Sequence, residues 1–233
     1  VDGIGGAVSL TLGKLFDLQT SGPAVIAAAG ASFTVNAPFI RLARTNDVIN
    51  AVTRTMPLGA GIGTLEFNAF RNLDLVGRLS FSDPLASASR SSVTFRSKGD
   101  IRLIGTQTEF NGVAAPGLVG GIASNGDMIF SAGQIYATTG TGNAQADYEL
   151  PVFKTDSQGQ KRRTNVSTPF AITSSADDGL ITFLAEPGAT ASDAYSAGAA
   201  ITVRAAKIVQ GGMLRAPLGK LTLGSNFSDA VAP

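Results

Sequence analysis

Residues 199–226, "AAITVRAAKIVQGGMLRAPLGKLTLGSN", repeat a short pattern of alternating apolar residues that a small residue interrupts. Ile201 and Val203 alternate with polar neighbours before Ala205, and the apolar pattern resumes at Ile208. Alternation with period two places one set of side chains on one face of a β-strand. We therefore interpret the stretch as short strands joined at corners, where the small residue marks a bend with little room inside.

The same pattern recurs along the chain. It appears in "FTVNAPFIRL" (33–42), "LEFNAFRNLDL" (65–75), "VTFRSKGDIRL" (93–103), "MIFSAGQIYA" (128–137), "ITFLAEPG" (181–188) and "LRAPLGKLTL" (214–223). The small residues expected at the corners are Ala37, Ala69, Ser97, Ala132, Ala185, Ala205 and Ala216. Their spacings of 32, 28, 35, 53, 20 and 11 residues indicate a recurring unit with insertions rather than a strict period. The shortest spacing predicts two corners in a turn of about twenty residues.

Stacked copies of such a unit bury one continuous apolar column, which is the principle of solenoid folds. The pattern predicts an all-β chain that forms a single parallel β-helix (β-solenoid) segment over residues 1–233. Residues 44–63 and 105–125 depart from the pattern as loops, and residues 138–176 form an insertion outside the helix. The alternative is a β-sandwich, which does not require a small residue at the same place in each strand pair. The polar residues between the apolar ones are expected to face water: Thr34, Asn36, Arg41, Arg96, Arg102, Thr202, Arg204 and Lys220.

Composition removes much of the usual catalytic chemistry. The 233 residues include no His, Cys or Trp, so the chain has neither a Ser–His–Asp triad nor His or Cys metal ligands. The net charge is +1, and the cationic "KRR" at 161–163 is interpreted as a solvated loop rather than a nucleic-acid site. The longest apolar run is too short to span a bilayer. The start at Val1 carries no signal peptide, which predicts a mature chain or a fragment of a longer one.

A carbohydrate-active enzyme on a β-helix would place several acidic residues on one outer face. Asp74, Asp100 and Asp127 are the candidates because they lie near equivalent positions of successive units. Asp100 and Asp127 follow Gly, however, and glycosidases require a carboxyl pair of defined separation. We interpret these residues as structural and expect no enzyme activity, and we assign no catalytic, cofactor-binding or metal-binding residue.

Other motifs also favour structural interpretations. The pair Asp177–Asp178 before Gly179 indicates a turn rather than a calcium site. Three Gly clusters, at 3–6, 59–63 and 117–121, lack the phosphate-binding spacing and are expected in turns. Two sequons, at Asn165 and Asn226, are interpreted as chance matches. Three tyrosines are expected to be exposed but define no site: Tyr136, Tyr148 and Tyr195.

The phrase "GGMLRAPLGKLTLG" at 211–224 resembles the repeat units of filamentous-haemagglutinin-type exoproteins, which bacteria secrete by the two-partner route. "GDIRLIG" and "GDMIFSAGQIYA" are similar to further phrases of that family, and the resemblance covers residues 65–145 and 178–226. The phrases typical of the family's N-terminal secretion domain are absent, which places the chain in the middle or C-terminal part of a fibre.

The resemblance implies a right-handed parallel β-helix in a secreted or cell-surface fibre that serves adhesion or biofilm formation. The partners it implies are an outer-membrane secretion protein and the glycans or proteins of host or bacterial surfaces. Exposed end turns also predict self-association. We expect no nucleic-acid partner and no cofactor, and the alternatives are a carbohydrate-active β-helix lyase or hydrolase and a self-assembling filament module.

Overall fold

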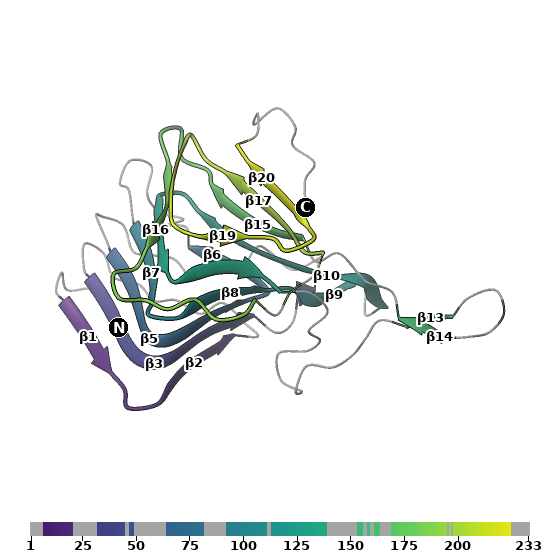
Figure 1. Cartoon of the computed structure of the whole chain (residues 1–233), viewed down its shortest axis with the longest axis horizontal. Coiled ribbons are helices and arrows are strands. Elements are labelled where there is room, and N and C mark those ends of the chain that lie inside the picture. Colours follow the sequence, from purple (N-terminus) through teal and green to yellow (C-terminus); the bar gives the residue numbers. More distant parts are fainter. Residues whose placement is uncertain are drawn as a thin grey trace.

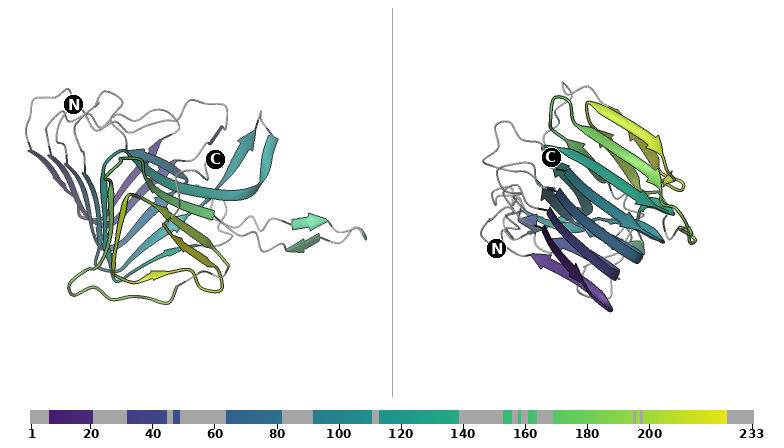
Figure 2. Two further views of the ribbon diagram at one scale, coloured as in Figure 1. Left: turned by 90° about the horizontal axis from the view of Figure 1, so that it is seen from above. Right: turned by 90° about the vertical axis from the view of Figure 1, so that its left-hand side faces the viewer.

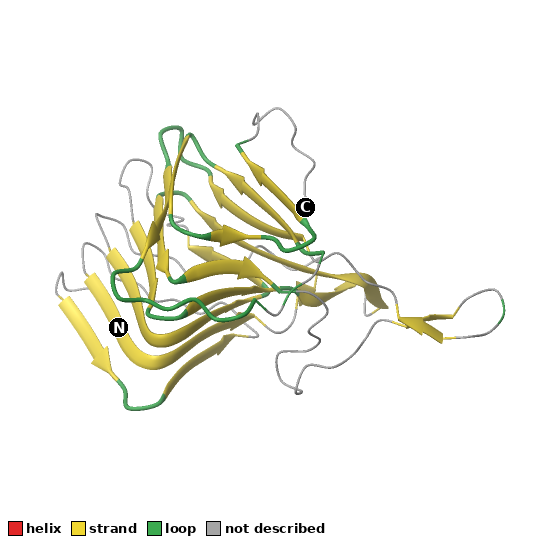
Figure 3. Cartoon of the chain, in the orientation of Figure 1, coloured by secondary structure: helices red, strands yellow, loops and turns green. Residues whose placement is uncertain are grey.

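The structure is a computed structural model, and it describes most of the chain. The described residues are 7–20, 32–44, 47–48, 64–81, 92–110, 113–138, 153–155, 158, 161–163, 169–194, 196 and 198–224. All regular secondary structure in these residues is β-strand, as Figure 3 shows. The predicted all-β class is therefore confirmed for the described part of the chain.

The strands stack in three parallel ladders that curl around a shared apolar interior (Figures 1 and 2). The first ladder consists of β1 (Ala7–Thr11), the first halves of β3 (Ser32–Arg44) and β5 (Thr64–Val76), β7 (Ser92–Ser97), β11 (Asp127–Ala132), β16 (Leu180–Ala185) and β18 (Lys207–Gly211). The second consists of β2 (Leu15–Thr20), the second halves of β3 and β5, β8 (Asp100–Ile104), β12 (Gln134–Ala137) and β19 (Leu214–Arg215). The third consists of β6 (Arg78–Phe81), β10 (Val113–Ser124), β15 (Pro169–Ser174), β17 (Ala200–Arg204) and β20 (Lys220–Leu223).

A column of stacked phenylalanine rings fixes the register of the first ladder. Phe67, Phe95, Phe130 and Phe183 are direct partners in successive strands, and all four side chains are buried. Neighbouring ring centroids lie 5.1–5.8 Å apart, in stacked geometry. Because each pass of the chain presents the same residue type to the interior, the period-two pattern of the sequence and the aromatic packing specify the same register.

The predicted corner residues are partly confirmed. Ala37 pairs with Ala69, and Ala69 with Ser97, at the corner between the first and second ladders. Ala132 likewise pairs with Ala185. The predictions for Ala205 and Ala216 are wrong, because Ala205 follows β17 of the third ladder and Ala216 follows β19 of the second.

A full pass of the chain is also longer than predicted. Ile181 pairs with Ile208, so the shortest pass takes 27 residues rather than about twenty. The pass is longer because each one supplies strands to three ladders, and not to the two sides that the shortest spacing suggested.

Four short strands lie outside the three ladders: β4 (Asp47–Val48), β9 (Thr106–Phe110), β13 (Phe153–Thr155) and β14 (Lys161–Arg163). β9 pairs antiparallel with the first part of β10, and the last residues of β10 join the third ladder. The expected loop at 105–125 is therefore wrong, since this segment contains two strands. β13 and β14 form a separate antiparallel pair, visible beside the ladders in Figure 1.

The predicted insertion at 138–176 ends in a strand of the third ladder. Residues Pro169–Ser174 form β15, which pairs with β10 on one side and β17 on the other. Strands that precede residue 138 pair directly with strands that follow residue 168 in the first and third ladders. The ladders therefore continue across the insertion, and their parallel pairing differs from the antiparallel sheets of a β-sandwich.

One pass contributes no strand to the second ladder. β12 pairs directly with β19, although β16 and β17 lie between them in the sequence. The residues that follow β16 instead cross the outside of the corner, where the Thr190 amide donates a hydrogen bond to the Lys98 carbonyl (3.0 Å). We call residues 186–194 the strap.

Candidate functional site

A row of polar side chains follows the outer face of the first ladder. Asn36, Asn68, Arg96 and Ser131 are register partners in β3, β5, β7 and β11. They face outward because each directly precedes a corner residue whose side chain faces the interior. The Asn68 Nδ2 atom donates a hydrogen bond to Asn36 Oδ1 (3.1 Å). The parallel register thus aligns residues that are about thirty positions apart in the sequence.

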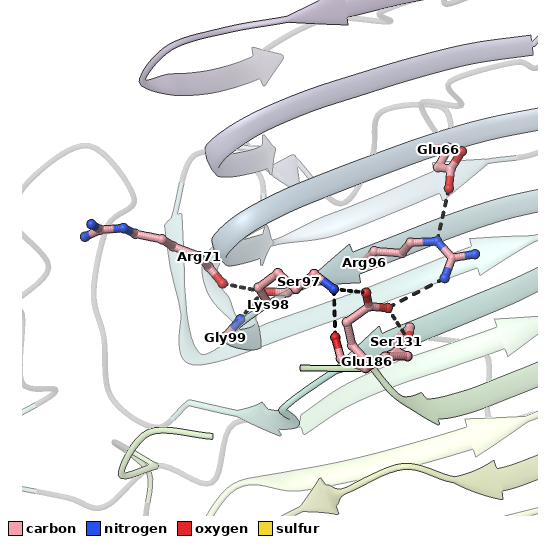
Figure 4. A network of polar contacts seen from close by, with 9 residues as sticks. Glu66, Arg71, Arg96, Ser97, Lys98, Gly99, Ser131 and Glu186 are labelled. Carbon is pink, nitrogen blue, oxygen red and sulfur yellow. Dashed lines mark hydrogen bonds and ion pairs between the residues drawn. The ribbon is translucent and has the colours of Figure 1, made fainter. Parts of the chain in front are cut away.

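The strap adds a carboxylate to this row (Figure 4). Glu186 Oε1 accepts a hydrogen bond from Lys98 Nζ (2.8 Å), and Glu186 Oε2 accepts one from Ser131 Oγ (2.8 Å). Arg96 Nη1 lies 3.6 Å from Glu186 Oε2, while Arg96 Nε donates to Glu66 Oε1 (3.0 Å). Arg96 therefore links two carboxylates that come from opposite ends of the chain.

The electrostatics of Glu186 favour its charged form. Only 9% of the side chain is exposed, and this burial alone would raise the pKa of Glu186. Hydrogen bonds from Lys98 and Ser131 and the charges of Lys98 and Arg96 outweigh burial, so the pKa of Glu186 lies below its ordinary value. A general acid in a glycosidase needs a raised pKa, which Glu186 does not have.

These residues border a shallow groove of about 290 Å³. It is lined by Asn36, Glu66, Asn68, Ala69, Phe70, Arg96, Ser97, Lys98 and Glu186. Phe70 stands at the corner with 53% of its side chain exposed. The Asn68 Oδ1 atom is buried and has no hydrogen-bond partner among the described residues. The groove thus combines an exposed aromatic ring, amide groups and ion-paired charges, which suits the binding of a polar ligand rather than proton transfer.

The three aspartates considered as enzyme residues do not form one site. Asp74 accepts two hydrogen bonds from Arg102, at 2.6 and 2.7 Å, on the outside of the second ladder. Asp100 is buried at the corner and accepts hydrogen bonds from the Ser192 hydroxyl and amide. Asp127 begins β11, and its Oδ1 atom accepts a hydrogen bond from the Leu180 amide (2.9 Å). The expectation that they occupy equivalent positions is wrong, because Asp100 is the register partner of Gln134 and Asp127 that of Ser92.

The second anchor of the strap is also structural. Gln134 Nε2 donates to the Ser192 carbonyl, and its Oε1 atom accepts a hydrogen bond from Arg215 Nη1 (3.0 Å). A Cβ atom on Gly133 would lie 2.8 Å from the Thr190 carbonyl carbon, so only Gly allows the strap to pass this closely. Tyr136, expected to be exposed, is fully buried in the ladder that the strap crosses, and that expectation is wrong.

Asp177 and Asp178 lie in a turn between β15 and β16, as predicted, where the Gly179 amide donates to the Ala176 carbonyl (3.0 Å). Gly120 and Gly121 lie in β10 and not in the expected turn, and a Cβ atom on Gly120 would lie 2.4 Å from the Phe170 ring. The KRR residues form β14. The remaining Gly clusters at 3–6 and 59–63 lie outside the described residues, as do Tyr148, Asn165, Tyr195 and Asn226.

The groove could be anticipated only in part. Asn36 and Arg96 were expected to face water, and the position directly before each corner residue would also have indicated Asn68. Nothing in the sequence pattern places Glu186 beside Lys98, because the strap leaves the regular pass.

Within the described residues no group of three or more acidic side chains is placed to hold a metal ion. The same residues include no helix of sufficient length and apolarity to cross a membrane. Comparison with protein-family models, with curated proteins and with solved structures finds no match to the chain.

Proposed function

We propose that the chain is a structural and adhesive segment of a secreted or surface-exposed bacterial fibre, built as a right-handed parallel β-helix. The continuous register of the three ladders supports this fold, since each pass of the chain lies directly on the previous one. Parallel strands joined by a crossover connection are right-handed in nearly all proteins, which supports the handedness. The repeat phrases that resemble filamentous-haemagglutinin-type exoproteins support the location and the export through an outer-membrane partner.

The groove beside Phe70 carries the adhesive part of the proposal. Sugar rings present hydroxyl groups around their edges and C–H groups on their faces. Amides and charged side chains bind hydroxyls through hydrogen bonds, and the exposed face of Phe70 offers a stacking surface. The buried Asn68 Oδ1 atom is an acceptor for one such hydroxyl. We therefore assign surface glycans as the ligand class.

A glycan array followed by isothermal titration with the best ligand tests this function. The substitution Phe70→Ala removes the stacking surface and should weaken binding about tenfold, as expected for the loss of one aromatic contact. Phe39→Ala is the matched control, because Phe39 is also exposed, at 39%, but does not line the groove. Equal effects of the two substitutions, or no glycan binding by the unaltered chain, would contradict the proposal.

The alternative function is a carbohydrate-active enzyme, and the groove supplies the only observation in its favour, namely that Glu66 and Glu186 both line it. Incubation of the glycan ligand with the chain distinguishes the two functions. Adhesion predicts an unchanged glycan, whereas a hydrolase or lyase releases new chain ends that disappear on Glu186→Gln.

A further inference from the structure

The two ends of the stack are complementary in charge along the second ladder. Outward-facing side chains alternate there in register: Asp17 pairs with Arg41, Arg41 with Asp74, and Asp74 with Arg102. The row begins with Asp17 in β2 at one end. At the other end Tyr136 follows Arg102, and the row finishes with Arg215 in β19.

The same two ends present apolar side chains that would face the interior of a longer stack. At the end formed by β1, Val8 and Leu10 are 38% and 39% exposed, although their register partners Phe33 and Val35 point into the core. At the other end Leu221 and Leu223 of β20 are 42% and 43% exposed. Their partners Ile201 and Val203 are fully buried, so these leucines continue a core that no described strand covers.

We propose that a second copy of this chain stacks head to tail, with β1 and β2 of one copy on β18 and β19 of the other. In the second ladder Phe16 and Leu18 then lie over Leu214 and Ala216, which places Asp17 beside Arg215. This junction repeats the Asp–Arg pairing already present between Asp74 and Arg102, which is bidentate.

The first ladder accepts the same junction. Val8 lies over Ile208, since both are inward-facing residues of their strands. Gln210, two residues further on, donates its amide to the Gly212 carbonyl (2.7 Å) and so stays hydrogen-bonded beneath Leu10. The outer edges of β18 and β1 also present backbone groups for parallel pairing, because among the described strands β18 pairs only with β16 and β1 only with β3.

Charge selects this arrangement over contact between like ends. Two copies joined through their β19 ends would place Arg215 against Arg215, and two joined through their β2 ends would place Asp17 against Asp17. Like charges directly opposite each other are unfavourable, whereas the head-to-tail junction pairs opposite charges. A head-to-tail contact leaves both outer ends free, so it produces an open-ended series of assemblies rather than a closed dimer. The inference does not depend on glycan binding.

Sedimentation velocity of the 233-residue chain over a wide concentration range tests the stacking. We expect a series of species that extends beyond the dimer as concentration rises. Arg215→Glu and Leu223→Lys should each weaken the junction about tenfold, because the first opposes two acidic side chains and the second places a charge in the apolar contact.

Two matched controls separate the junction from general effects of charge. Arg71→Glu makes the same charge change as Arg215→Glu, but at an exposed corner in the middle of the stack. Val209→Lys makes the same kind of change as Leu223→Lys at a residue of similar exposure, 47%, that faces outward from the last pass. Both controls should associate like the unaltered chain.

A chain that stays monomeric at all concentrations, a closed dimer, or equal effects of all four substitutions would overturn the inference. Electron microscopy of the unaltered chain gives a second readout that does not depend on the folding of any variant. Particles should lengthen along the stack axis without becoming wider, and assemblies that widen would contradict end-to-end stacking.

Discussion

At the scale of single residues, Leu218 has the least favourable conformation for its residue type. It follows Pro217 in a tight turn in which the Gly219 amide donates to the Ala216 carbonyl (2.9 Å). Its φ of 53° lies in the left-handed region, which in this turn position favours Gly or Asn. With 93% of its side chain exposed, Leu218 gains almost no burial in return.

Leu218→Asn should therefore raise the free energy of unfolding by about 0.5–1 kcal/mol, because Asn tolerates positive φ and no buried contact is lost. Urea denaturation measures the change. Leu218→Val is the control and should destabilise, since β-branched residues tolerate this region worst. An unchanged or lower stability for the Asn variant would contradict the strain.

The phenylalanine column and the groove offer the same substitution in two environments. Phe130→Ala should lower the free energy of unfolding by about 3–5 kcal/mol, because Phe130 is fully buried between Phe95 and Phe183. Phe70→Ala should change it by less than about 0.5 kcal/mol, since its ring is half exposed. Thermal or urea unfolding of both variants checks the contrast, and similar losses in the two would contradict the assignment of Phe130 to the core.

At the scale of elements, the strap is held by charge and hydrogen bonds rather than by apolar packing. The pKa of Glu186 is lower in the folded chain than in the unfolded chain. Its ionised form therefore stabilises the fold at pH values above the unfolded pKa, and this contribution disappears as the pH falls through the folded pKa.

The difference in unfolding free energy between the unaltered chain and Glu186→Gln should thus be largest near neutral pH and vanish in acid. Urea denaturation at a series of pH values measures it. Glu66→Gln is the control and should show a smaller difference, because the Glu66 side chain is 36% exposed and contacts one cation. A Glu186 effect that persists unchanged in acid would mean that the ion pairs do not hold the strap.

The sequence predicts some elements of this fold better than others, and the reason is physical. Alternation identifies inward-facing residues such as Phe67 and Phe95 wherever a strand is half buried. It does not identify β15, because Phe170 and Ile172 lie beside the long departure from the pattern. It also misplaces Tyr136, whose burial depends on the strap, and the contact that holds Glu186 at Lys98 joins residues 88 positions apart. Local periodicity carries no information about such a contact.

At the scale of the whole molecule, the central claim is that the chain on both sides of residues 139–168 forms one parallel stack. Ile129 in β11 and Thr182 in β16 are register partners on the outer face, 53 residues apart in the sequence. Partner residues in neighbouring strands lie about 4.8 Å apart, within the range that a disulfide bridges. The chain contains no cysteine, so an introduced pair is the only one able to react.

The most direct measurement is oxidative cross-linking of the double variant Ile129→Cys/Thr182→Cys, followed by mass spectrometry of the linked peptides. The control is Ile129→Cys/Leu184→Cys, which uses the same face two residues out of register. The account predicts rapid, near-complete cross-linking in the first variant and little in the second. Equal cross-linking in both, or none in the first, would contradict a single parallel stack in this register.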